Sequence, residues 1–119
     1  MTTYRFIRYS SLQAAIDQLA ELDVIEESTT ARTLTDADNG RVIRCTNAAG
    51  CAITVGGLSD GFGCLIVQKG AGSVTFAADG SSTLNAFSGA TQTAGLNAQA
   101  TVIKEADGGT EYLLGGEVN

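Results

Sequence analysis

The spacing of apolar residues changes near residue 30, and this change most constrains what the chain can fold into. From residue 32 on, apolar and polar residues alternate with a period of two in short runs, as in "AITV" (52–55) and "SVTFA" (73–77). Segments rich in Gly, Asn, Asp and Ser separate these runs and are typical of turns. Because a period of two is that of a strand with one buried face, residues 31–119 are predicted to form a mainly β domain.

The turn segments divide this domain into eight predicted strands. They are expected at residues 33–35, 41–46, 52–56, 63–69, 73–78, 82–87, 98–106 and 110–116. Short strands at this spacing are typical of antiparallel sandwiches, jelly rolls and small barrels. The chain has no proline, so glycine has to shape its turns. We therefore expect an antiparallel β-sandwich or jelly-roll-like domain.

The stretch "CLIVQKGAGSVTFAADG" (64–80) combines a lysine with a glycine pair and so could suggest a phosphate-binding loop. Such a loop needs the lysine after the glycines and a helix directly behind it. Here Lys69 precedes Gly70 and Gly72, and an alternating β-branched run follows them. The stretch is therefore predicted to be a β-hairpin whose glycines supply positive φ angles.

The first 30 residues follow a different pattern and are predicted to form an N-terminal arm and one α-helix. In the segment 10–27, Leu12, Ile16 and Leu19 have helical spacing. Acidic residues crowd the end of this segment and oppose the helix dipole, so the helix is expected to end near residues 23–26. Its narrow apolar stripe is typical of a helix that packs on a neighbouring chain or lies along a groove.

The arm ahead of the helix concentrates aromatic and arginine side chains, which are enriched at binding anchors. It is interpreted either as a short strand on its own domain or as an anchor on a partner. We take residues 1–30 as an attachment and oligomerisation unit. Its candidate partner-binding residues are Tyr4, Arg5, Phe6, Ile7 and Arg8 of the arm, with Leu12, Ile16 and Leu19 of the helix.

Composition excludes several classes of function. The net charge is −6, which disfavours nucleic-acid binding, because that relies on basic patches. The apolar runs are too short for a membrane span, and the N-terminus lacks the apolar core of a secretory signal, so we expect a protein made in a cytoplasm. There is no histidine, which removes the commonest general base and zinc ligand.

The remaining candidate residues, which are carboxylates and cysteines, are interpreted as structural rather than catalytic or metal-binding. Among six carboxylates that could act in pairs, all but Glu105 lie in turns, where Asp is favoured for backbone reasons. The segment "DADNG" (36–40) lacks the spacing and the final Glu of a calcium loop. Cys45, Cys51 and Cys64 have no metal-binding spacing and are expected to be buried and reduced, although one pair can bridge if its strands are neighbours. We predict no catalytic residue, no metal and no cofactor.

An ordered set of motifs resembles a small β-domain of tailed-bacteriophage virion proteins. The set runs from "TLT" through "VIR", "TN", "ITV", "GF" and "GAGSVTF" to "LLG", within residues 31–117. Two positions depart from the resemblance, with Gly56-Gly57 where a proline is common and Tyr112 where a tryptophan is common. The first 30 residues lie outside it.

The resemblance implies a structural role in a virion, assembled in the cytoplasm of the host bacterium, and no enzymatic activity. Family members occur as capsid decoration proteins, head fibres and tail fibres. The length favours a decoration (cement) protein that binds the major capsid protein or another virion subunit as a homotrimer. The alternative is a tail-fibre or head-fibre protein whose β-domain binds a host surface glycan.

Overall fold

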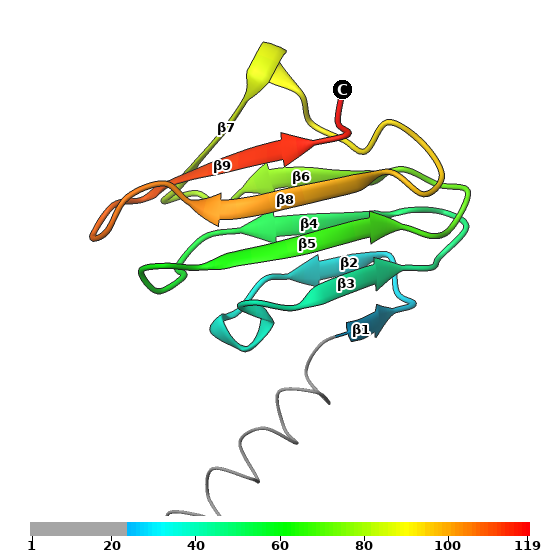
Figure 1. The fold of residues 1–119 in the computed structure, drawn as a ribbon, viewed down its shortest axis with the longest axis horizontal. Coiled ribbons are helices and arrows are strands. Elements are labelled where there is room, and N and C mark those ends of the chain that lie inside the picture. The colour runs from blue at the N-terminus through cyan, green and yellow to red at the C-terminus, as the bar shows by residue number, and fades with distance from the viewer. Residues whose placement is uncertain (1–23) are drawn as a thin grey trace, which may run out of the picture.

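Nine strands in two sheets form the framework of residues 24–119, which are the residues that the computed structural model describes (Figure 1). Sheet A contains, in spatial order, β1 (Val24–Glu27), β3 (Val42–Cys45), β5 (Gly63–Gln68), β8 (Gln99–Lys104), β9 (Glu111–Gly116) and β7 (Thr83–Ala86). Sheet B contains β2 (Ala31–Thr33), β4 (Cys51–Val55) and β6 (Val74–Ala78). Two short 3-10 turns, η1 (Asp36–Asp38) and η2 (Phe87–Gly89), complete the elements. The prediction of a mainly β protein is confirmed.

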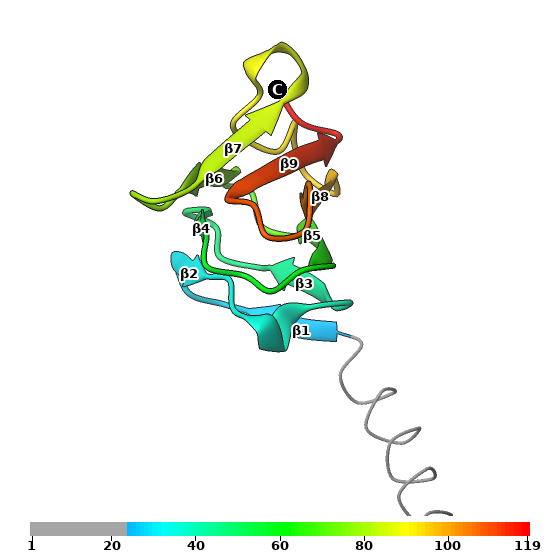
Figure 2. The ribbon, with the colours of Figure 1, turned by 90° about the vertical axis from the view of Figure 1, so that its left-hand side faces the viewer.

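The first six strands wind as three stacked coils. The chain passes from a strand of sheet A to a strand of sheet B and back. Each of the strands β3 to β6 pairs in parallel with the strand two positions earlier in the chain. We call β1–β2, β3–β4 and β5–β6 the first, second and third coils. Figures 1 and 2 show that the strands of sheet A and those of sheet B form two sheets, in which β1 to β6 follow one another in the same direction through the molecule.

The pairing differs from the antiparallel arrangement expected from the sequence. Only the pairs β5 with β8 and β8 with β9 are antiparallel, whereas β7 pairs with β9 in parallel. Period-two alternation is the same in both arrangements and does not distinguish them. The direction is set at the corners, because residues 46–50 and 69–73 carry the chain across the core to the opposite sheet rather than back beside the previous strand.

The expected hairpin at residues 64–80 is therefore wrong, because β5 and β6 lie in different sheets. Gly70 and Gly72 are not among the glycines with positive φ. They are required by the stacking of one corner on another: a Cβ on Gly70 would overlap the carbonyl oxygen of Asn47, and one on Gly72 would overlap the backbone nitrogen of Gly50. The glycine pair is thus the contact between the corners of the second and third coils.

The helical segment expected at residues 10–27 does not include residues 24–27, because these form strand β1. Ile25 lies in register with Ile43, and backbone pairing with β3 along all four residues replaces the helical hydrogen bonds. Tertiary pairing here outweighs a local helical pattern that its acidic end already weakened. No α-helix occurs among residues 24–119, and the rest of the predicted helix and the arm lie outside the described residues.

The core fills the space between the two sheets. Inward positions stack from coil to coil, so that Ile25, Ile43 and Ile66 form one column of sheet A while Ile53 and Phe76 meet it from sheet B. Burying each such side chain contributes roughly 1.5–3 kcal/mol. Strands β8 and β9 extend the same wall beyond the third coil with inward-facing side chains such as Val102, Tyr112 and Leu114, which join the core.

Candidate interaction surface

The carboxylates in the turns accept hydrogen bonds from neighbouring turn segments and so link these segments. Asp36 accepts hydrogen bonds from the backbone N–H of Ser59 at 2.8 Å and from its hydroxyl at 2.6 Å. Asp60 accepts from the Lys104 ammonium and from the backbone N–H of Gly108, both at 2.8 Å. These contacts lower the pKa of both carboxyls. Asp36 and Asp60 thus have the structural role that their position in turns predicts.

A charged triad lies inside the first coil. Arg32 occupies an inward position of sheet B and pairs with Glu27 at 2.7 Å and with Asp38 at 2.5 Å. Asp38 is 1% exposed and also accepts the backbone N–H of Thr35. Hydrogen bonds from Thr29 and Arg32 lower the pKa of Glu27, and the two carboxylates raise that of Arg32. The triad thus places charged groups at an inward position that is apolar in the second and third coils, where Ile53 and Phe76 stand.

The three cysteines are free and buried, as expected from the sequence. Burial raises the pKa of Cys45 to about 12, and the neighbouring Cys51 adds to this rise. Burial likewise raises the pKa of Cys64 to about 12 and that of Cys51 above its ordinary value. Thiols in this state are poor nucleophiles and poor metal ligands. Among residues 24–119 no three Cys, Asp or Glu side chains gather as a metal-binding group.

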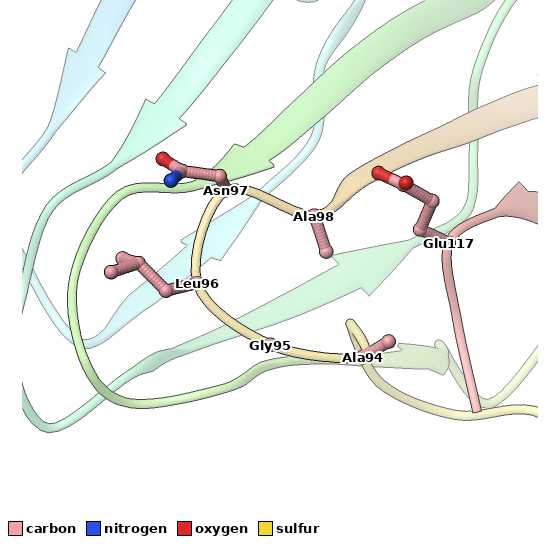
Figure 3. A pocket seen from close by; sticks show the side chains of 6 residues that line it. All are labelled: Ala94, Gly95, Leu96, Asn97, Ala98 and Glu117. Atoms are coloured by element: carbon pink, nitrogen blue, oxygen red, sulfur yellow. The ribbon is translucent and has the colours of Figure 1, made fainter.

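An open depression of about 370 Å³ lies between the loop before β8 and the chain after β9 (Figure 3). In Figure 3 the side chains of Leu96 and Asn97 point away from that of Glu117. The polar groups of this depression already have partners, since Asn97 accepts from Lys69 at 2.6 Å and Glu117 accepts from the backbone N–H of Gln99. The depression therefore offers no converging polar groups to a small ligand.

The predicted partner-binding residues of the arm and helix all lie outside the described residues, so the structure neither brings them together nor separates them. It does show where their segment joins the molecule. Residue 24 begins β1, which is the last strand at one side of sheet A and pairs with β3 alone among the described strands. Among residues 24–119, no strand pairs with the outer backbone edge of β1, and an edge of this kind can accept a further strand.

The outer face of sheet A carries a group of aliphatic side chains that the sequence analysis did not identify. Val24 is 50% exposed, Ile103 is 42% exposed and Leu113 is 38% exposed. Three half-buried side chains on the same face lie among them. We call this group the aliphatic face, and its members are Val24, Val42, Leu65, Val67, Ile103 and Leu113.

A sequence signal for this face was present. The segment "LIV" (65–67) in β5 and the pair "LL" (113–114) in β9 place apolar residues on both faces of a strand, because successive side chains point to opposite sides. The inward-facing alternation of each strand, taken alone, does not indicate this outer face. Polar residues border the face, among them Glu26 and Arg44, which form an exposed ion pair at 2.7 Å.

Comparisons with known proteins found no matching family model, no similar curated protein and no similar solved structure. Within residues 24–119 there is no helix long and apolar enough to cross a membrane.

Proposed function

We propose that this protein is a structural component of a tailed-bacteriophage virion, and specifically a capsid decoration protein that binds the head shell as a homotrimer. The observation that carries the proposal is the position of β1 as the outermost described strand of sheet A, since the chain that leads into it carries the aromatic and arginine residues of the arm further upstream. An open strand edge accepts a strand of another protein through main-chain hydrogen bonds, and aromatic anchors then add affinity.

The described part of the chain also supports a role in which rigidity matters more than chemistry. The coils are stacked through backbone hydrogen bonds, and their connecting loops are held by side-chain contacts such as those of Asp36 and Asp60. Every buried side-chain polar atom of the described residues has a hydrogen-bond partner. Such a domain can reinforce a shell against internal pressure without rearranging.

The proposal is tested by binding to the heads of the phage whose genome carries this gene. The full chain is mixed with expanded and unexpanded heads, and bound protein is measured after sedimentation. We expect saturable binding to expanded heads, and we expect deletion of residues 1–9 to abolish it. The matched control is the double variant T2A/T3A, which changes the same arm without touching an aromatic or arginine residue.

The circular dichroism spectrum of the deletion variant shows whether residues 24–119 still fold, so that loss of binding is attributed to the arm. Retained binding after the deletion would overturn the role of Tyr4, Arg5, Phe6, Ile7 and Arg8. Absence of binding by the full chain would overturn the decoration proposal itself.

One observation favours the alternative, a head-fibre or tail-fibre protein that binds a host surface glycan. Phe87, in the turn η2 beyond β7, is 91% exposed, whereas the other aromatic rings of residues 24–119 are buried. An exposed ring can stack on a sugar. In this alternative the isolated protein binds host cells or surface polysaccharide, and F87S reduces that binding at least tenfold while head binding is absent.

A further inference from the structure

The two outer faces of the same coils differ in composition, and this difference indicates which one is covered. The outward positions of sheet B form two columns of small residues, with Ala31, Ala52 and Thr75 in one and Thr33, Thr54 and Ala77 in the other. The corresponding outward positions of sheet A carry the aliphatic face together with the ion pair of Glu26 and Arg44. The outer face of sheet B thus carries small residues, whereas the outer face of sheet A carries larger aliphatic side chains.

The aliphatic face is continuous across the sheet. Val24, Val42 and Leu65 lie side by side on β1, β3 and β5. Thr101 stands directly opposite Leu65 on β8, and Ile103 stands opposite Gly63, which has no side chain, so that Ile103 is the diagonal neighbour of Leu65. Leu113 pairs with Ile103 on β9. A contiguous apolar surface of this kind on a protein marks a contact with another segment or molecule.

We propose that the aliphatic face is covered by residues 10–22 of the same chain, folded as the amphipathic helix that their sequence predicts. This assigns Leu12, Ile16 and Leu19 to packing on sheet A, and it leaves the arm ahead of them available to a partner. The inference does not rest on the proposed function, because it concerns a different segment and a contact within one chain.

The dimensions of the two surfaces agree. A helix of residues 10–22 is about 20 Å long at 1.5 Å per residue. The four strand spacings from β1 to β9 add to about 19 Å. A helix that ends at residue 22 meets the sheet at Val24, the member of the aliphatic face at its edge. The helix as a whole is therefore long enough to cross the face, and its apolar stripe from Leu12 to Leu19 covers about 10 Å of that length.

The covalent connection favours this occupant over a second copy of the chain. Only Asp23 separates the segment from the first residue of the face. A segment held this close has an effective concentration in the millimolar range, above the concentration of any free copy under ordinary conditions. The polar side of the same helix, with Asp17 and Glu21, would then face water.

The placement is tested with a nitroxide label on Gln18→Cys in the full chain, because the native thiols are buried. We expect the label to broaden the methyl NMR signals of Ile103 and Leu113 in the same molecule. We expect no broadening in a mixture of labelled chains and separate isotope-enriched chains. Broadening in the mixture would assign the face to a second copy, and absence of broadening in both samples would mean that residues 10–22 do not cover it; either result overturns the proposal.

A pair of variants supplies a second measurement. I16S/L19S removes the apolar stripe, and Q18S/E21S introduces the same residue type on the opposite side of the predicted helix. We expect I16S/L19S to bind the apolar dye ANS several-fold more strongly and to unfold at a lower temperature than Q18S/E21S. Equal dye binding and equal melting by the two variants would contradict the docking of the segment on sheet A.

Discussion

Arg32 is a charged residue at an inward position of the first coil. In the second and third coils the same inward position of sheet B holds Ile53 and Phe76, and in the first coil it holds an arginine. The arginine is tolerated at this inward position because the carboxylates of Glu27 and Asp38 balance its positive charge. Losing the cation leaves two carboxylates in a largely buried site without their partner.

We expect R32M to destabilise the protein because both carboxylates lose their ion pair with the guanidinium group. Breaking a buried pair costs about 3–5 kcal/mol, and since Arg32 is 23% exposed we expect on the order of 2–3 kcal/mol. Urea denaturation measures the loss. The control is R44M, which breaks the exposed pair with Glu26 and should cost less than about 1 kcal/mol. Equal losses in the two variants would contradict the role given to the triad.

The pH dependence of stability should report on Glu27. Its pKa in the folded protein is lowered from the ordinary 4.5, chiefly by the hydrogen bond from Thr29. The folded state therefore binds this proton less readily than the unfolded state, so the stabilisation is complete above the unfolded pKa and is lost as the pH falls through the folded pKa.

We expect E27Q to be less stable than the wild type at pH 7, and we expect the difference to shrink as the pH is lowered from about 5 to about 3. Urea titrations at several pH values measure both. E26Q, altered at the neighbouring exposed acid, is the control and should stay within about 1 kcal/mol of the wild type at pH 7. A difference for E27Q that is constant with pH would exclude a contribution from ionisation.

At the scale of elements, the corners decide how the strands are arranged. The corner 69–73 rests directly on the corner 46–50, and Lys69 and Gly70 donate their backbone N–H groups to the carbonyl of Cys45. The carboxamide of Asn47 in turn donates to the carbonyl of Ser28, one coil further down. Corners therefore stack by direct backbone contact, which leaves no space for a side chain at Gly70.

We expect G70A to destabilise the fold by about 1–3 kcal/mol, since the added Cβ forces the two corners apart. G80A is the matched control, because a Cβ at Gly80 meets nothing within 4 Å and that glycine is not among those with positive φ. Thermal unfolding of both variants measures the difference. A G70A protein as stable as G80A would mean that the corners can separate at little cost.

At the scale of the whole molecule, the C-terminal strands are joined to the stacked coils by specific contacts. The hydroxyl of Tyr112 in β9 accepts the backbone N–H of Leu58, which lies in the connection from β4 to β5, at 3.0 Å. The hydroxyl of Thr93 donates to the side chain of Gln68 and accepts the backbone N–H of Val74, linking β5 and β6 from a third segment. These buried contacts join residues that are far apart in the sequence.

We expect Y112F to cost about 1–3 kcal/mol, because it leaves the buried N–H of Leu58 without an acceptor. Hydrogen exchange should show faster exchange at Leu58 in addition to the loss of global stability. T110V, which removes an exposed hydroxyl next to the same strand, should change neither. Unchanged exchange at Leu58 in Y112F would contradict the contact.

The sequence located the strands from residue 41 onward well because alternation and turn composition are local properties. It missed β1, whose four residues carry too little local signal against a neighbouring helical pattern. It also gave no sign of the coils, because register partners are 18 residues apart between Val24 and Val42 but 23 apart between Val42 and Leu65. Without a constant period, no repeat is visible in the letters.

The features of the candidate surfaces also fall into two groups, those that the sequence predicts and those that only the tertiary structure shows. The structural role of the turn carboxylates and the burial of the cysteines could be predicted, since both depend on residue type and immediate context. The aliphatic face could not, because it is formed by side chains of β1, β3, β5, β8 and β9 that share a face only once those strands are in register. The triad of Arg32 likewise depends on stacking.

The sequence alone therefore determined the secondary structure class, the approximate strand positions and the absence of histidine chemistry, because each is set by residue identity and by neighbours a few positions away. Only the tertiary structure decided strand direction, the stacking of corners and which outer face is apolar. Those properties depend on hydrogen bonds and packing between residues about 20 positions apart or more, and the free energy of such contacts is not encoded in any one local pattern.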